Sequence, residues 1–242
     1  MHKNVVLIPT YNEADSIADL LRDLRDSEVD VIVIDDESPD GTATIVNNLG
    51  LEFVKVVNHG KKRGIGPAYI SAMNIAMDAG YEKIATMDAD GSHLSRDLKT
   101  MFTSALNCDV VMGTRWMPGG AVSNWSTRRK CLSRFGTWYA RKCLALPYRD
   151  LTGGFRVYDA KKLGTLNMQR IRSNGYCFQI EMIKALHSLE SQIIEIPIHF
   201  IERRGGVSKM SNGIVVEAFR RVSLWGFQRV CRINADKLHY VK

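Results

Sequence analysis

Short apolar runs alternate with stretches of helical spacing along the first half of the chain. Ile17, Leu20, Leu21 and Leu24, for example, recur at the spacing of one helix face. The predicted strands are 5–8, 31–34, 53–57, 84–87 and 110–112, and the predicted helices between them are 17–24, 43–49, 67–79 and 98–106. Strands that alternate with helices predict an α/β fold with a mostly parallel central sheet flanked by helices.

The second half has a less regular pattern. We expect helices over 127–146, 178–189 and 214–230, and short strands over 153–158 and 193–200. Residues 116–125 contain Pro118-Gly119-Gly120 and are predicted to form a mobile loop, while Pro197 suggests that the last strand lies at a sheet edge. No repeat, low-complexity segment or clear linker divides the 242 residues, which we therefore interpret as one domain.

Composition narrows the kinds of partner. The chain has 33 Lys and Arg against 26 Asp and Glu, a net charge of +7, which suits phosphates, nucleic acid or an acidic membrane surface. Its five cysteines form no C-x-x-C motif, so we expect reduced thiols in a cytoplasmic protein rather than a zinc or redox site. There is no signal-peptide pattern and no uncharged apolar stretch of about 18 residues, so any membrane contact is expected to be peripheral.

Two carboxylates follow the predicted strand at 84–87. Asp88 and Asp90 are two residues apart, so an extended backbone aims both to the same side. Their mutual repulsion is relieved by a divalent cation, and oxygen ligands suit Mg²⁺ or Mn²⁺. A polar turn with an Asp helix cap is the alternative for such a pair alone. Two other strand ends, at Pro9–Glu13 and at Asp35-Asp36, carry polar motifs, and ligands of parallel sheets bind at such ends, so a metal–diphosphate site is predicted.

Other polar residues suggest contacts with a nucleotide. Asp36 lies at the carboxyl end of the predicted strand 31–34 and is a candidate acceptor for hydrogen bonds from a nucleobase or ribose. Asp40 or Thr42 is expected to cap the next helix. The candidate phosphate-binding residues, for which a solvated basic face is the alternative, are Arg115, Arg128, Arg129, Lys130, Arg203 and Lys209. His59, His93 and His199 are isolated, so we interpret them as loop or core residues rather than zinc ligands.

Together these motifs resemble the inverting glycosyltransferases with a GT-A fold, in glycosyltransferase family 2. More narrowly, they resemble the branch that synthesises dolichol-phosphate (polyprenol-monophosphate) mannose. The resemblance covers almost the whole chain, and its specific pieces are Asp35–Thr42, Asp88–His93, Gly113–Trp116, Asp150–Arg156 and Gly175–Met182. It implies a Rossmann-like GT-A domain over 1–242, with a nucleotide-sugar-binding half at 1–115 and an acceptor-binding half at 116–242.

The resemblance also implies residue roles. The residues implied to contact GDP-mannose, through its guanosine part or its diphosphate, are Pro9, Tyr11, Glu13, Asp36 and Ala89. Asp88 and Asp90 would hold the metal, and Ser92 stands where some relatives carry a further Gln ligand. Arg115, Arg129 and Arg203 would bind phosphates of the donor and the lipid acceptor, and Lys209 would close over the donor. The candidate catalytic residues are Asp88, Asp90 and Arg115.

The implied reaction is inverting transfer of mannose from GDP-mannose to a polyprenyl (dolichyl) phosphate. A phosphate acceptor has a second pKa near about 6 and arrives ionised, so it needs no general base, unlike a sugar hydroxyl. Transfer of another sugar, such as glucose from UDP-glucose, is the alternative within the family. Two alternatives come from other classes. The intact Asp88 and Asp90 pair counts against a nucleotide-sugar-binding protein without turnover, and the lack of a nucleic-acid motif counts against a nucleic-acid binder.

The acceptor's apolar tail implies a membrane surface. We expect the helix after Arg128 and the segment Phe219–Phe227 to lie on a bilayer, because both combine basic with apolar residues. The expected location is the cytoplasmic face of a membrane, with a possible membrane-anchoring subunit and no nucleic-acid partner.

Overall fold

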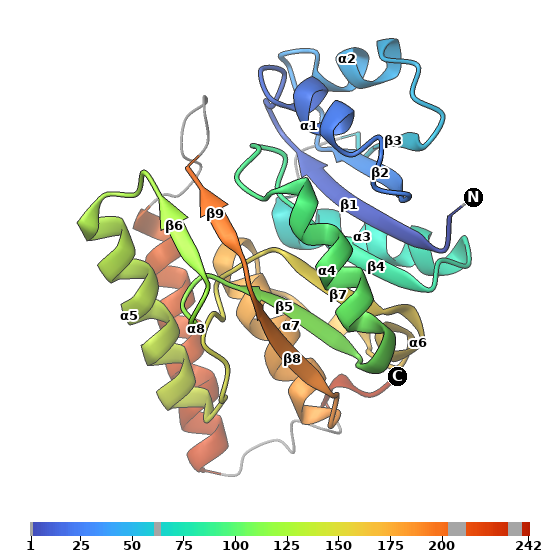
Figure 1. The fold of residues 1–242 in the computed structure, drawn as a ribbon. Helices are drawn as coiled ribbons and strands as arrows, with labels where there is room; N and C mark the ends of the chain where they lie inside the picture. The colour runs from blue at the N-terminus through green and yellow to red at the C-terminus, as the bar shows by residue number, and fades with distance from the viewer. Residues whose placement is uncertain (1, 61–63, 203–211, 232–238) are drawn as a thin grey trace.

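A seven-stranded sheet crosses the molecule, with helices on both faces and a pair of long helices at one end (Figure 1). The computed structural model describes residues 2–60, 64–202, 212–231 and 239–242. The strands lie in the order β3-β2-β1-β4-β7-β5-β8. Their bounds are β1 Asn4–Thr10, β2 Asp30–Asp35, β3 Val54–Asn58, β4 Lys83–Thr86, β5 Val110–Thr114, β7 Arg156–Asp159 and β8 Ile193–Pro197.

The sheet is mostly parallel, as predicted. β7 alone of these strands runs antiparallel, between β4 and β5, while the other described pairs in the sheet are parallel. The chain builds β1, β2 and β3 outward in one direction and then returns to place β4 on the other side of β1. Such a reversal opens a crevice at the carboxyl ends of β1 and β4, which is where ligands bind in sheets of this kind.

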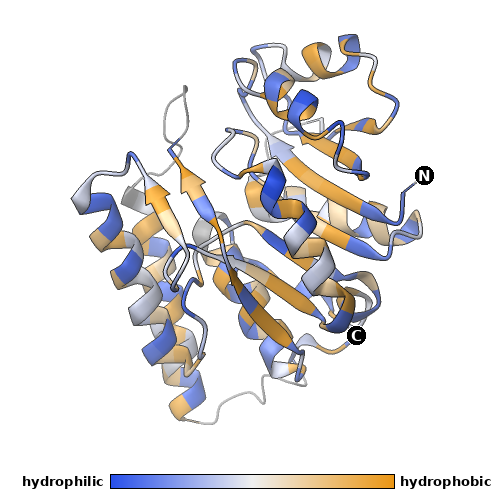
Figure 2. Cartoon of the chain, in the orientation of Figure 1, coloured by the Kyte–Doolittle hydropathy of each residue, from blue (hydrophilic) through white to orange (hydrophobic). Residues whose placement is uncertain are grey.

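Alternating side chains of the strands supply two apolar cores, and Figure 2 shows the strands as largely hydrophobic. Val6 and Ile8 of β1 face one core, whereas Val5 and Leu7 face the other. The first core is covered by α1 Ile17–Asp23, α2 Thr42–Asn48 and α4 Ser95–Ser104. The second is covered by α3 Ile65–Asp78, α6 Ala160–Gly164 and α7 Gly175–Ser188.

Two long helices extend the second half of the chain. α5 Thr127–Leu144 and α8 Asn212–Val230 pack side by side, and α8 also contacts α7 (Figure 1). These elements confirm the helices predicted in this half. Among the described residues, no helix has both the length and the apolar character needed to cross a bilayer.

Two predictions for the second half are corrected by strand pairing. Residues 116–125 are not entirely a loop, because β6 Ala121–Ser123 pairs in parallel with β9 His199–Ile201. The strand predicted over 193–200 is divided at Ile198, so that β8 ends at the sheet edge and β9 joins the small second sheet. Ile198 connects the two sheets, since its N–H donates to Thr114 O (3.2 Å) and its carbonyl accepts from Ala121 N (3.0 Å).

Candidate active site

The polar segments that follow β1, β2 and β4 meet at one edge of the sheet, which confirms the expected convergence. Thr10 and Asp35 are paired at the ends of β1 and β2. In the loop after β1, Ser16 Oγ donates a hydrogen bond to the carbonyl oxygen of Ala89 (2.9 Å), and Asn12 N donates to Ser38 Oγ (3.0 Å). The loop that contains Tyr11 and Glu13 is thereby held beside the two carboxylates that follow β4.

Asp36 lies at this edge and is buried. Its Oδ1 is 3.0 Å from His59 Nδ1, and its Oδ2 accepts from Gly64 N (2.9 Å). Asp36 therefore fixes the segment after β3, and its contact with a nucleoside stays a prediction. Asp40 accepts from Thr42 N (3.0 Å) in the first turn of α2, although Gly41 is the N-cap residue itself.

Asp88 and Asp90 follow β4, and both line one pocket. The side chain of Asp88 is 34% exposed. Asp90 Oδ1 accepts from both the backbone N (3.1 Å) and Oγ of Ser92. Ser92 is fully buried and supports Asp90, so its role as a metal ligand stays a prediction.

Glycine makes room beside Asp88. A Cβ at Gly154 would lie 3.4 Å from Asp88 Oδ1 and 3.3 Å from Gln179 Nε2. A larger residue there would crowd both the Asp88 carboxylate and the Gln179 side chain of α7. The close approach of these two segments could not be read from either motif alone.

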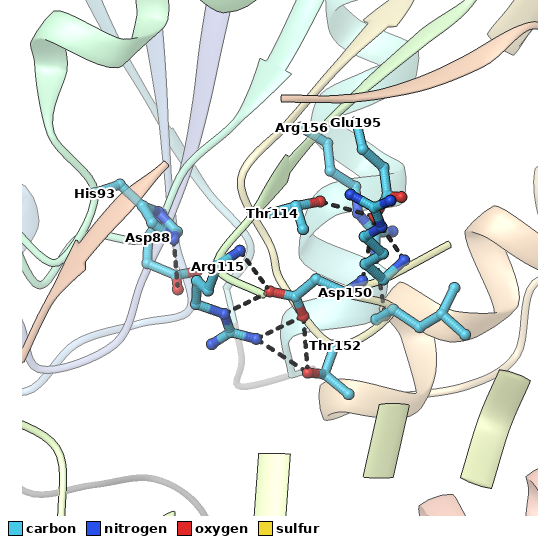
Figure 3. A network of polar contacts seen from close by, with 10 residues as sticks. Asp88, His93, Thr114, Arg115, Asp150, Thr152, Arg156 and Glu195 are labelled. Atoms are coloured by element: carbon cyan, nitrogen blue, oxygen red, sulfur yellow. Dashed lines mark hydrogen bonds and ion pairs between the residues drawn. The ribbon is translucent and has the colours of Figure 1, made fainter. Parts of the chain in front are cut away.

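His93 lies beside Asp88 (Figure 3). Its Nδ1 accepts a hydrogen bond from Asp88 N (3.2 Å), and its Nε2 lies 3.9 Å from Asp88 Oδ2. Burial lowers the pKa of His93 to about 4. The interpretation of His93 as a core residue is confirmed by this burial, but its contact with Asp88 was not foreseen.

Arg115 is fixed by a buried partner that the sequence did not single out. Its Nε donates to Asp150 Oδ2 (2.6 Å), and its Nη2 donates to Asp150 Oδ1 (2.8 Å) and Thr152 Oγ1 (3.0 Å), as Figure 3 shows. Burial by itself raises the pKa of Asp150, but the guanidinium of Arg115 outweighs it and holds that pKa below its usual value. The only signal in the sequence was that Asp150 opens one of the family-like motifs.

Aromatic rings hold the neighbouring arginines. The Arg129 guanidinium lies 4.1 Å from the ring centroid of Trp125, and its Nη1 is 2.7 Å from Glu202 Oε1. Arg115 lies 5.2 Å from the same Trp125 ring and 5.4 Å from that of Phe200. The expected phosphate-binding residues Arg203 and Lys209 lie outside the described residues.

One pocket joins these groups. It spans from the carboxyl ends of the strands, where Asp88, Asp90 and Arg115 line it, past Arg129 near the start of α5, to the space between three helices. Its apolar lining from α5, α7 and α8 is Leu132, Gly136, Ile180, Val215, Ala218, Phe219 and Val222. The pocket therefore combines carboxylates, guanidinium groups and an apolar groove.

The described carboxylates of this pocket suit a hard divalent cation. Asp88 and Asp90 are the acidic residues among its described lining, and the described part of the chain holds no cluster of three or more His, Cys, Asp and Glu at metal-binding distance. Two carboxylates leave the remaining coordination positions to water and phosphate oxygens, a pattern typical of Mg²⁺ or Mn²⁺ sites.

Comparison with known proteins agrees with this geometry. Residues 5–166 match glycosyl transferase family 2. The chain is 42% identical over 226 residues to an undecaprenyl-phosphate mannosyltransferase from Micrococcus luteus, which covers 92% of this chain and 93% of that protein. It is 35% identical over 232 residues to a polyprenol monophosphomannose synthase from Mycolicibacterium smegmatis, covering 93% and 88% of the two chains.

Solved structures with lower identity share the fold. A glucosyl-3-phosphoglycerate synthase from Mycobacterium tuberculosis, solved with Mn²⁺ and UDP, has a TM-score of 0.64 at 15% identity, covering 96% of this chain and 80% of that one. A mannosyltransferase from Pyrobaculum calidifontis, solved with GDP-Man and Mn²⁺, has a TM-score of 0.57 at 17% identity, covering 96% and 65%. The family match and the two relatives show that this chain belongs to glycosyl transferase family 2.

Proposed function

We propose that this protein transfers mannose from GDP-mannose to a polyprenyl phosphate and releases GDP. The observation that carries the proposal is the pocket that places two carboxylates, two arginines and an apolar groove in one space. The two relatives named above act on this class of acceptor by name. An acceptor that is anionic at one end and a hydrocarbon at the other fits both parts of such a pocket.

The donor would lie at the sheet edge, in the half formed by residues 1–115. The residues proposed to contact GDP-mannose there are Pro9, Tyr11, Glu13, Asp36 and Ala89. Asp88 and Asp90, with Ser92 as the further candidate, would hold a divalent cation, and when bound the cation neutralises charge that develops on the departing diphosphate. The presence of Mn²⁺ in two structures of this fold supports such a metal, and GDP-Man in one of them supports the donor.

The acceptor phosphate would lie beside Arg129 and Arg115. One of its oxygens attacks the anomeric carbon of mannose from the face opposite the diphosphate, the new carbon–oxygen bond forms as the old one breaks, and the configuration inverts. The guanidinium group of arginine can donate two parallel hydrogen bonds to phosphate oxygens, so the two arginines offset the repulsion between the two anionic substrates. Arg203 and Lys209 are proposed to complete this set of basic residues.

The proposed acceptor explains why the pocket needs no further carboxylate. A phosphate monoester has a second pKa of about 6 and is largely ionised at neutral pH, so no side chain has to remove a proton. Glu181, the acidic residue on nearby α7, accepts hydrogen bonds from Arg172 N (3.1 Å) and Ser173 N (2.9 Å) instead. It therefore supports local backbone rather than acting as a base.

The polyprenyl chain would leave the site along the groove between α5, α7 and α8. The two long helices, α5 and α8, expose large apolar side chains, which are Leu132, Phe135 and Trp138 on α5 and Val216, Leu224, Phe227 and Val230 on α8. α5 also carries six basic and no acidic residues. Exposed apolar and basic residues on one pair of helices suit the surface of an anionic bilayer, so we propose peripheral binding there, on the cytoplasmic face, with or without an anchoring subunit.

The decisive test is an assay with radiolabelled GDP-mannose, a polyprenyl phosphate in detergent, and Mg²⁺ or Mn²⁺. We expect labelled mannose to enter the organic phase as a polyprenyl phosphate mannose, and chelation of the metal to abolish its formation. A parallel reaction with labelled UDP-glucose should give no product. Transfer from UDP-glucose but not from GDP-mannose would establish the alternative donor, and binding of GDP-mannose without any transfer would contradict the enzymatic function.

A further inference from the structure

His93 is buried at the end of the loop that carries Asp88 and Asp90. Its side chain is 2% exposed, and its ring stacks on Phe155 (4.7 Å between centroids, 14° between planes). The edge of Phe200 closes the other side, at 5.2 Å and 79°. These two rings leave the imidazole little freedom to turn.

The hydrogen bond from Asp88 settles which nitrogen carries the proton. Because Nδ1 accepts from Asp88 N, a neutral imidazole must be protonated at Nε2. The Nε2–H then faces Asp88 Oδ2, with 3.9 Å between the nitrogen and the oxygen. The same ring therefore lies next to both the backbone N–H and the carboxylate of Asp88. In this tautomer neither nitrogen offers a lone pair to a cation in the pocket.

We infer that His93 is a positioning residue that sets the orientation of Asp88 toward the divalent cation. This inference rests on the proposed function, because it assigns a supporting partner to the proposed metal ligand. The segment from Asp88 to His93 has no regular secondary structure to fix its side chains, so their orientation depends on side-chain contacts such as those of His93. Partners behind a ligand typically change metal affinity by about 10- to 100-fold when removed.

The same group of contacts connects the segment from Asp88 to His93 with β9. Ile201 N of β9 donates to Ser92 O (3.0 Å), and Phe200 touches both His93 and the Arg115 guanidinium. His93 is therefore fixed from the side of the pocket where the acceptor phosphate would bind. A displaced imidazole would remove this support from Asp88 while leaving the bonds between Asp90 and Ser92 in place.

Calorimetric titration of Mn²⁺ into the protein with saturating GDP tests this without any turnover. His93→Phe keeps an aromatic ring between Phe155 and Phe200 but removes both nitrogens, so we expect Mn²⁺ affinity to fall by about tenfold or more. His93→Asn keeps a hydrogen-bond acceptor near the position of Nδ1, so its Mn²⁺ affinity should fall by less. His187→Phe, at an exposed histidine on α7, controls for nonspecific metal binding by histidine and should leave the Mn²⁺ affinity unchanged.

The outcomes separate the inference from the function on which it rests. If folded His93→Phe, checked by its melting curve, bound Mn²⁺ as tightly as the original protein, the positioning role would be overturned. If His93→Phe failed to fold, the test would compare His93→Asn with Asp88→Asn, which lacks the Asp88 carboxylate. A Mn²⁺ affinity of His93→Asn as low as that of Asp88→Asn would overturn the role of the Nδ1 bond. Absence of Mn²⁺ binding by the unaltered protein with GDP would instead contradict the proposed metal site itself.

Discussion

Arg115 and Asp150 form a two-point ion pair in the interior, with Nε 2.6 Å from Oδ2 and Nη2 2.8 Å from Oδ1. The Asp150 side chain is completely buried and that of Arg115 is 6% exposed. The carboxylate balances much of the arginine's charge and fixes its guanidinium against the aromatic rings of the pocket wall. We therefore expect Arg129, which is paired with a more exposed carboxylate, to supply more of the attraction for an incoming phosphate.

Asp150→Asn should destabilise the fold. Removal of one partner leaves the other charge buried without compensation, which typically costs about 3–5 kcal/mol of unfolding free energy. Denaturant-induced unfolding at neutral pH measures the loss. Asp19→Asn, at an exposed ion pair with Arg22 on α1, is the matched control and should change stability by less than about 1 kcal/mol.

The effect of Asp150→Asn should depend on pH. The pKa of Asp150 is lowered in the folded protein, so its carboxylate contributes stability above the unfolded-state value of 3.8, and this contribution is lost as pH falls through the folded-state pKa. The difference in stability between the original protein and the variant should thus be fully present from neutrality down to the unfolded-state value of 3.8, and should shrink as pH falls further toward the folded-state pKa. A difference that stays constant down to strongly acidic pH would contradict this assignment.

Asp90→Asn should remove most of the metal-dependent transfer. The amide carries no charge to hold the cation, and loss of a group that stabilises developing charge typically costs about 10²- to 10³-fold in rate. The measurement is formation of mannolipid at saturating Mg²⁺ or Mn²⁺, and Asp19→Asn again serves as the control. Full metal-dependent activity of Asp90→Asn would refute the proposed site.

Gly136→Leu should obstruct the apolar groove. A Cβ at Gly136 would meet nothing within 4 Å, although this residue lines the pocket, so a leucine there extends into open space rather than into a neighbouring atom. When the polyprenyl chain occupies this space, the leucine would compete with it. Crowding of a filled apolar space costs about 1–3 kcal/mol, so we expect transfer to polyprenyl phosphate to fall by about tenfold or more.

Two features make the Gly136 prediction specific. Binding of GDP-mannose should be unchanged, since the donor would lie at the sheet edge. Gly136→Ala, which adds one methyl group and suits a helix interior better than glycine, should retain transfer. Equal transfer by the leucine and alanine variants would show that the lipid does not pass along this groove.

The double variant Phe135→Glu with Trp138→Glu should weaken membrane binding. These side chains are 49% and 53% exposed on α5, and burial of each aromatic group in a bilayer is worth about 1.5–3 kcal/mol. Flotation with anionic vesicles should recover the original protein at the top of the gradient and much less of the variant. Leu106→Glu, at a residue that is 70% exposed but lies outside both long helices, should float like the original protein; equal flotation of all three would contradict the proposed surface.

The sequence by itself determined the alternation of strands and helices and the place of the acidic pair. Continuous short apolar runs, and apolar residues with a period of 3.6, report burial that is decided locally, so β1, β2, β4 and the long helix α5 were predictable. The position of Asp88 and Asp90 just after an apolar run was equally visible. Because the ends of parallel strands meet at one edge, their nearness to the loop after β1 could be predicted as well.

Only the tertiary structure decided how the site is supported. The Arg115–Asp150 pair and the His93–Asp88 contact depend on which segments pack together, since each partner alone reads as an ordinary polar residue. The same holds for the insertion of β7 between β4 and β5, for the pairing of β6 with β9, and for the groove at Gly136 between helices remote in sequence. Hydrophobic periodicity tells which face of an element is buried but not which element covers it, and that choice is made by the packing of the whole chain.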